Sequence, residues 1–117
     1  MNAFKINGTS LTLQPSSHKW LGRDNLGADG LGHPMYPAVR EYELRWDAMT
    51  PAEFAQVQGF YDFVSSTGTV VVDLPKYANS TYSFYAYSGC VLQEPYFGGY
   101  FEENLQDVTL LVLNIRT

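Results

Sequence analysis

The stretch "DVTLLVLNIRT", residues 107–117, decides the fold because it has the pattern of a strand without a polar face. Side chains of a strand point alternately to the two sides of the sheet, so every second residue shares a face. One face carries Val108, Leu110 and Val112, and the other carries Thr109, Leu111, Leu113 and Ile115. A strand with two apolar faces is covered on both sides. We therefore expect a central strand with a second sheet on one side and a helix on the other.

One segment has the pattern of a helix, "TPAEFAQVQGFYDFVSSTG", residues 50–68. Thr50 and Glu53 form a capping box, and Pro51 stands at the first helical position. Apolar side chains then recur at helical spacing, at Phe54, Val57, Phe60 or Tyr61, and Val64. The pattern predicts a single helix that ends between Ser65 and Gly68.

The remaining segments predict strands. "FKINGTSLTLQP", residues 4–15, has the pattern of a hairpin around Asn7-Gly8, a pair that favours a type I′ turn, with Pro15 ending the second strand. "REYELRWDAM", residues 40–49, alternates between apolar and charged side chains, as a strand with one wet face does. Two further strands are expected in "GTVVVDLP" and in the aromatic "TYSFYAYSGCVLQEP", the latter bent at Gly89, with the next turn at Gly98-Gly99.

This order of elements predicts a mainly β protein: a β-sandwich or a partly closed barrel with one α-helix packed on it and a long loop between strands 2 and 3. The chain has 117 residues, a common size for one domain, and shows no internal repeat. We expect a single domain over residues 1–117, with a loop arm at about 16–39.

Composition and charge narrow the possible functions. No run of apolar residues is long enough to span a membrane, and the N-terminus lacks the pattern of a signal peptide, so we expect a soluble protein made in a cytoplasm. Residues 1–40 carry four cations and two acids, whereas residues 41–117 carry three cations and ten acids. Such an acidic chain is a poor match for nucleic acid, which is bound through clustered Lys and Arg, but it could pair with a copy of itself.

The glycine-rich stretch "GRDNLGADGLGHP", residues 22–34, does not match known ligand loops. Its glycines are in the wrong order for a dinucleotide fingerprint, no helix follows, and no Lys follows the glycines as in a P-loop. Asp24, Asn25 and Asp29 lack the spacing and the distal Glu of an EF-hand, which leaves a fortuitous calcium site as an alternative.

Catalytic patterns are also absent from the sequence. His18 and His33 have no partner in sequence that would orient them, and the single cysteine, Cys90, excludes an intrachain disulfide and a cysteine-based metal site. Paired carboxylates could come from Glu94, Glu102, Glu103 and Asp107, but sequence does not place them across a cleft. We predict that the protein is not an enzyme and uses no cofactor or metal.

An alternative function is carbohydrate binding on a β-sandwich face. Stacking aromatics for it could be drawn from Tyr82, Phe84, Tyr85, Tyr87, Tyr96, Phe97, Tyr100 and Phe101. The same side chains could instead divide between the core and an interface between subunits.

The layout of a strand pair, a long arm, a strand, the capped helix "TPAEFAQVQGFYDFV", then "GTVVVDLP", an aromatic strand ending in "VLQEP" and a final apolar strand resembles the small tail proteins of long-tailed bacteriophages. The nearest forms are the tail-tube fold and the N-terminal domain of distal tail proteins. The resemblance implies a virion protein, made in the host cytoplasm, that forms a homo-oligomeric ring, commonly a hexamer. Neighbouring tail-tube and tail-tip proteins would be its partners, DNA would pass through the ring, and no membrane would be involved. The tube, tip-adaptor and tail-completion roles stay open.

On this resemblance, the arm becomes the element that orders on a neighbouring subunit. Its glycines give flexibility, and its apolar side chains are ones that a soluble monomer would not expose. The expected contact residues are Trp20, Leu21, Arg23, Leu26, Leu31, Met35 and Tyr36. Lys19 and Arg23 are expected to meet Glu41 or Glu43 of an adjacent copy.

Overall fold

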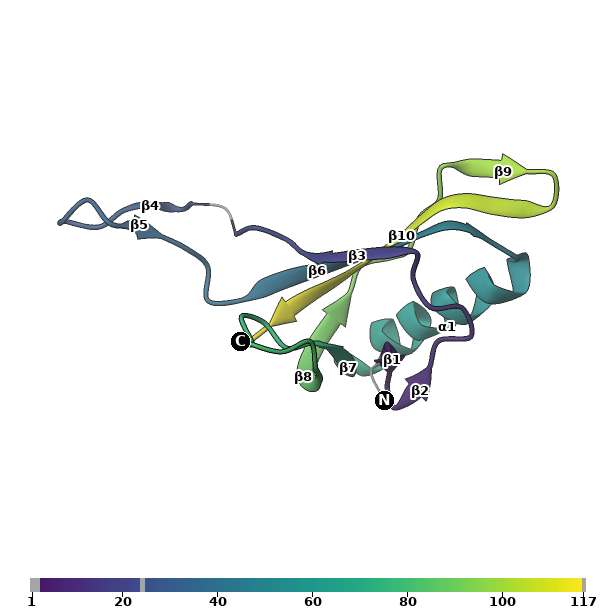
Figure 1. Cartoon of the computed structure of the whole chain (residues 1–117), viewed down its shortest axis with the longest axis horizontal. Coiled ribbons are helices and arrows are strands. Elements are labelled where there is room, and N and C mark those ends of the chain that lie inside the picture. The colour runs from purple at the N-terminus through teal and green to yellow at the C-terminus, as the bar shows by residue number, and fades with distance from the viewer. Residues whose placement is uncertain (1–2, 24, 117) are drawn as a thin grey trace.

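The computed structural model describes residues 3–23 and 25–116. It consists of a curled antiparallel sheet with one helix against it (Figure 1). The elements are β1 (Lys5–Ile6), β2 (Thr9–Ser10), β3 (Ser17–Trp20), β4 (Gly27–Ala28), β5 (Pro34–Met35), β6 (Arg40–Met49), α1 (Pro51–Thr67), β7 (Val70–Pro75), β8 (Phe84–Leu92), β9 (Gly99–Phe101) and β10 (Asn104–Ile115). Asp24 and Thr117, which entered the sequence predictions, lie outside the described residues.

The sheet has the strand order β2-β1-β7-β8-β10-β6-β3, and β9 pairs with the start of β10. It does not close, because β2 and β3 stand at its two edges. The strands β4 and β5 form a separate two-stranded ribbon. The expected mainly β fold with one helix is confirmed, and an open sheet of this kind fits a sandwich or an open barrel.

β10 is the central strand, as predicted, but it is covered unevenly. Val108, Leu110 and Val112 lie opposite Trp46, Leu44 and Tyr42 of β6, and all six side chains are buried. We call this side the core face; on the other face Thr109 is buried, while Leu111 and Leu113 are half-exposed. The expectation of full cover on both sides is therefore wrong for the second face. A register shift between Val112 and Ile115, with Asn114 at φ 61°, explains why Ile115 is nevertheless buried.

The helix begins as predicted. The Thr50 side chain accepts a hydrogen bond from the Glu53 amide, and the Glu53 carboxylate accepts one from the Thr50 amide. Val57 and Val64 are buried, and α1 contacts β8 and β10. Among the described residues, no helix is both long and apolar enough to cross a membrane.

The N-terminal hairpin has the predicted turn but shorter strands. Asn7 and Gly8 both have positive φ, 56° and 77°, as a type I′ turn requires. β2 ends at Ser10 rather than at Pro15. Beyond it the chain crosses toward β6, where the Leu13 carbonyl accepts a bond from the Trp46 indole and the Ser16 amide donates to Arg45.

Two further sequence predictions are corrected by the structure. The turn expected at Gly98-Gly99 lies instead at Glu102-Glu103, where Glu102 has φ 56°. Gly98 instead allows the chain to pass close to β10, since a Cβ there would lie only 3.3 Å from the Asp107 Cβ. The loop expected over residues 16–39 contains β3, which pairs with β6, and the β4–β5 ribbon.

Candidate functional site

Of the loop arm expected at about 16–39, residues 17–20 form β3 and the part from 21 to 39 projects (Figure 1). From here on we call residues 21–39 the arm and the rest of the molecule the body. The arm leaves the end of β3 and returns into β6. Its two limbs are held together by backbone hydrogen bonds, 2.7 Å from the Leu26 amide to the Met35 carbonyl and 2.9 Å from the Asp29 amide to the His33 carbonyl. The predicted arm is thus a short ribbon, and its strands β4 and β5 have two residues each.

The tip of the arm is organised by Asp29. Its carboxylate oxygen Oδ1 accepts hydrogen bonds from the amides of Leu31 and His33, at 2.8 and 3.0 Å. These bonds, that from His33 first, lower the pKa of Asp29 below its ordinary value of 3.8. The other carboxylate oxygen lies 3.5 Å from His33 Nδ1 and forms an ion pair when that imidazole is protonated.

Four large apolar side chains of the arm face solvent. The exposed fractions are 66% for Leu26, 82% for Leu31, 44% for Met35 and 47% for Tyr36. Arg23 lies at the arm's root, where its guanidinium donates to the Pro37 carbonyl at 2.8 Å and sits 5.0 Å from the Tyr36 ring centre. Four of the predicted contact residues are therefore exposed on one projecting element.

Trp20 and Leu21 differ from those four. The Trp20 indole donates to the Pro75 carbonyl at 3.2 Å, and the ring meets Tyr42, Tyr77 and Tyr87 edge to face. Leu21 is half-buried, and its amide donates to the Glu41 carbonyl. Because Trp20 lies on the core side of β3, it holds the arm's root to the body of its own chain.

The predicted charge partners also meet within the chain. Lys19 lies opposite Glu43 in the β3–β6 ladder, and its ammonium is 3.7 Å from the Glu43 carboxylate. Glu41 lies on the same face of β6, two residues before Glu43, and is exposed. The pair between Lys19 and Glu43 therefore forms without a neighbouring copy, while a contact from Glu41 to another chain stays a prediction.

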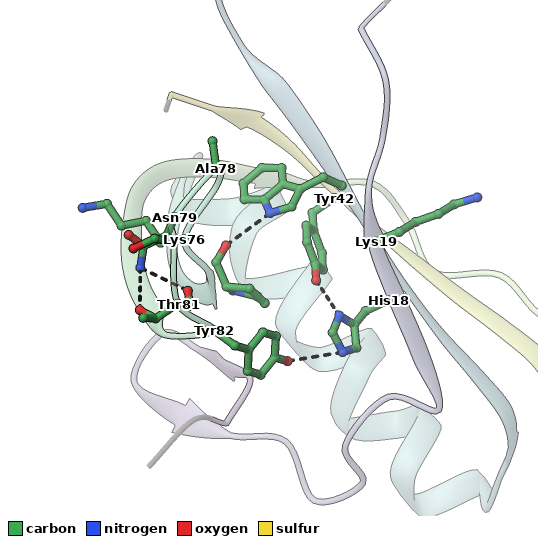
Figure 2. Close-up of a pocket in the computed structure, with 11 residues that line it drawn as sticks. His18, Lys19, Tyr42, Lys76, Ala78, Asn79, Thr81 and Tyr82 are labelled. Atoms are coloured by element: carbon green, nitrogen blue, oxygen red, sulfur yellow. Dashed lines mark hydrogen bonds between the residues drawn. The ribbon is translucent and has the colours of Figure 1, made fainter.

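A cavity of about 420 Å³ lies between β3 and the loop that joins β7 to β8 (Figure 2). In it the His18 ring stands between two tyrosines, with Nδ1 2.5 Å from the Tyr42 hydroxyl and Nε2 3.5 Å from the Tyr82 hydroxyl. Figure 2 shows Lys19 pointing away from this group. The loop on the opposite side is held by the Asn79 amide, which donates to Ser83 and Thr81.

Burial favours the neutral forms of His18 and Tyr42. It lowers the pKa of His18 and raises the pKa of Tyr42, to which the nearby Tyr82 adds. Tyr42 thus remains a hydroxyl that can donate to a neutral His18, rather than a phenolate nucleophile. The cavity can offer hydrogen bonds and aromatic edges, but these shifts are opposite to those that would activate the pair for nucleophilic catalysis.

A second cavity, of about 230 Å³, lies at the end of the body where β6 begins and β10 ends, and is lined by Lys76, Tyr77, Tyr85, Tyr87 and Arg116. The Arg40 guanidinium lies 3.7 Å from the Tyr77 ring centre, and the Lys76 ammonium lies 5.6 Å from that of Tyr85. We call these five lining residues with Arg40 the basic pocket. No local sequence pattern indicates this pocket, because the antiparallel pairing of β6 with β10 is what brings Arg40 and Arg116 to one end.

The aromatics considered for carbohydrate stacking are divided between different parts of the molecule. Tyr82 and Phe84 contact edge to face, as do Tyr85 and Tyr87, along the start of β8. Phe97 and Tyr100 form another pair beside β9, where the hairpin projects at the right of Figure 1. Tyr87 is buried, and Phe84 and Phe97 are half-buried. The eight rings therefore do not share one flat face.

Metal ligands do not converge in the part of the chain described. No group of three or more His, Cys, Asp or Glu side chains there is placed to hold a metal ion. His18 and His33 lie apart, in the cavity and at the arm tip, and the calcium alternative cannot be followed at Asp24, which is outside the described residues. Cys90 is buried, and burial raises the pKa of its thiol to about 11.

The arm and the basic pocket both lie at the end of the body where β6 begins. Comparison with protein-family models, with curated proteins and with solved structures finds no match to this chain.

Proposed function

We propose that the protein is a structural subunit of a bacteriophage tail that forms a homo-oligomeric ring at or near the tail tip. The proposal starts from the resemblance in element order and is carried by one observation, the projecting arm with its exposed apolar side chains. Leu31 at the tip is 82% exposed, more than any other large apolar side chain among the described residues, most of which lie buried in one core. An apolar patch on a projecting ribbon is typical of a surface that a partner covers.

The partner proposed is a second copy of the chain. Each copy would insert its arm against the body of the next, which is a heterologous contact and closes into a ring when the rotation between copies allows it. The net charge of −5 supports a lumen through which DNA moves without adhering. Neighbouring tube and tip proteins would stack on the ring as further partners.

Self-association in solution tests this proposal. We expect light scattering across a concentration series to show a large species, and negative-stain images of that species to show rings. In the comparison variant, residues 26–35 are replaced by two glycines, because the Leu26 amide and Met35 carbonyl are only 2.7 Å apart and a tight turn can join these limbs. This variant should fold but remain monomeric.

Point variants separate the arm's side chains from its backbone. Leu31→Ser should weaken assembly, whereas Phe63→Ser, which removes an exposed ring on α1, should leave it unchanged. If the excised protein forms the same oligomer as the wild type, the arm is not the contact. A strict monomer at high concentration that binds glycans, and loses them on Tyr100→Ala, would replace the tail function with the carbohydrate-binding alternative.

A further inference from the structure

The basic pocket gathers positive charge that no carboxylate of residues 3–23 and 25–116 neutralises. Arg40, Lys76 and Arg116 are three of the seven Lys and Arg residues of an acidic protein. None of the three forms an ion pair with a carboxylate among the described residues. Arg40 Nε is, in the same part of the chain, a buried nitrogen without a hydrogen-bond partner. Buried donors are normally paired, so Arg40 is incompletely satisfied. Lys76 and Arg116 line the cavity itself, and their charges are the ones that an anionic partner can reach.

The pocket's walls are aromatic. Tyr85 is 53% exposed and stands edge to face against Tyr87, 5.0 Å between ring centres, while Tyr77 is enclosed between Trp20 and Arg40. A cation beside an exposed ring, such as Lys76 over Tyr85, can bind a carboxylate while the ring packs against an aromatic side chain next to that carboxylate. The complementary surface should therefore carry carboxylates beside exposed aromatic side chains.

The chain displays such a surface on the β9–β10 hairpin. Tyr100 and Phe101 are 64% and 62% exposed, and Glu102 and Glu103 form the exposed turn that follows them. Neither carboxylate forms an ion pair within the described residues. We call these four residues the acidic tip.

The acidic tip and the basic pocket lie at opposite ends of the same strand. β10 starts next to the tip at Asn104 and ends at Ile115, one residue before Arg116 (Figure 1). A tip therefore cannot reach the pocket of its own chain, but it can reach that of another. Complementary surfaces at two ends of one molecule generate head-to-tail association.

We propose that the acidic tip of one copy binds in the basic pocket of the next, with Glu102 or Glu103 meeting Lys76 and Arg116, and Phe101 packing against Tyr85. This rests on the proposed ring and names the contact that joins its subunits. The arm starts beside the pocket, because β6 begins at Arg40, and so it would lie along the same neighbour. One interface would then include the apolar side chains of the arm and the contact between the acidic tip and the basic pocket.

Charge reversal tests the contact. Lys76→Glu with Arg116→Glu, and separately Glu102→Lys with Glu103→Lys, should each weaken association by about tenfold or more. A mixture of the two reversed proteins should recover part of that loss, because the swapped charges attract again across one interface. Glu94→Lys, an exposed acid outside the tip, is the matched control and should change little.

Cross-linking tests the same contact without relying on affinity. Because Cys90 is buried, an added cysteine supplies the accessible thiol. Mild oxidation of mixed Tyr85→Cys and Phe101→Cys proteins should give a disulfide-linked dimer with one of each, and a mixture of Tyr85→Cys with Phe63→Cys should give none.

The outcomes separate this contact from the ring itself. If the wild type forms rings but the reversed proteins assemble equally well and no mixed dimer appears, the tip-to-pocket contact is wrong and the ring stands. A mixed dimer without rings would support the contact and overturn the ring. If neither rings nor mixed dimers form, both proposals fall.

Discussion

Trp46 ties the central strand pair to the segment that precedes β3. Its side chain is fully buried, and its indole donates to the Leu13 carbonyl at 2.9 Å. Trp46→Phe keeps an aromatic ring but removes that donor, and it leaves a partly buried carbonyl without a partner. We expect the free energy of unfolding to fall by about 1–3 kcal/mol, measured by urea denaturation. An unchanged urea midpoint would show that solvent already satisfies the Leu13 carbonyl.

His18 gives the body a pH dependence. Burial lowers its pKa below the ordinary 6.5, so the folded state favours the neutral ring and the unfolded chain takes up the proton first. The stability that depends on neutral His18 is present above pH 6.5 and is lost as the pH falls through the lower pKa of the folded state. His18→Gln should therefore flatten the fall in unfolding free energy between neutral pH and pH 5. Parallel curves for the two proteins would contradict this.

Among the elements, the arm tip depends on one carboxylate. Asp29→Ala removes the acceptor for the Leu31 and His33 amides, so we expect both amides to exchange faster with solvent while those of β6 and β10 are unaffected. Since these bonds lower the pKa of Asp29, the wild-type tip should loosen only as the pH falls below the ordinary 3.8. Hydrogen exchange followed by NMR measures both effects. Equal protection in the variant would mean that the backbone bonds of the ribbon are sufficient.

Local signals made some elements predictable. The capping box of α1 and the Asn7-Gly8 turn are each encoded within a few residues, and both appear in the structure as expected. β3 is not predictable from its own residues, because "SHKW" is a four-residue strand shortly after a proline and pairs with β6, more than twenty residues away. The pair Gly98-Gly99 is typical of a turn, but the turn of the hairpin lies at Glu102-Glu103, where Glu102 has a positive φ.

Some features of the candidate site also follow from local sequence, and others depend on residues far apart in the chain. The sequence indicates which apolar side chains are exposed on the arm, because a glycine-rich and polar segment does not form a core. These side chains are Leu26, Leu31, Met35 and Tyr36. The place of Trp20 did not follow, because its partners Tyr77 and Pro75 come from a distant loop and strand end. The basic pocket likewise needs four segments to meet, which composition and spacing do not reveal.

The shape of the whole molecule reflects the arm. The principal extents are 55 × 31 × 30 Å, and the radius of gyration of the Cα atoms is 15.6 Å. A compact chain of similar length has about 13 Å. Replacing residues 26–35 by two glycines should bring the radius toward that value, measured by small-angle X-ray scattering at concentrations where both proteins are monomers. Equal radii would mean that the arm folds back on the body in solution.

The arm is continuous with β3 and β6, so tension on its tip is directed along these strands. β6 is paired with β10 over nearly its whole length by backbone bonds that lie across the strands. Pulling between residues 31 and 103 loads these bonds in shear and strains them together, whereas pulling between residues 31 and 116, at one end of the pair, unzips them in turn. We expect optical tweezers to record a higher rupture force for the first attachment than for the second, and equal forces would contradict this. The mechanical strength of this sheet then depends on the direction of the load. An interface that held one copy by its arm and by its acidic tip would load the β6–β10 bonds in shear, the direction in which they resist most.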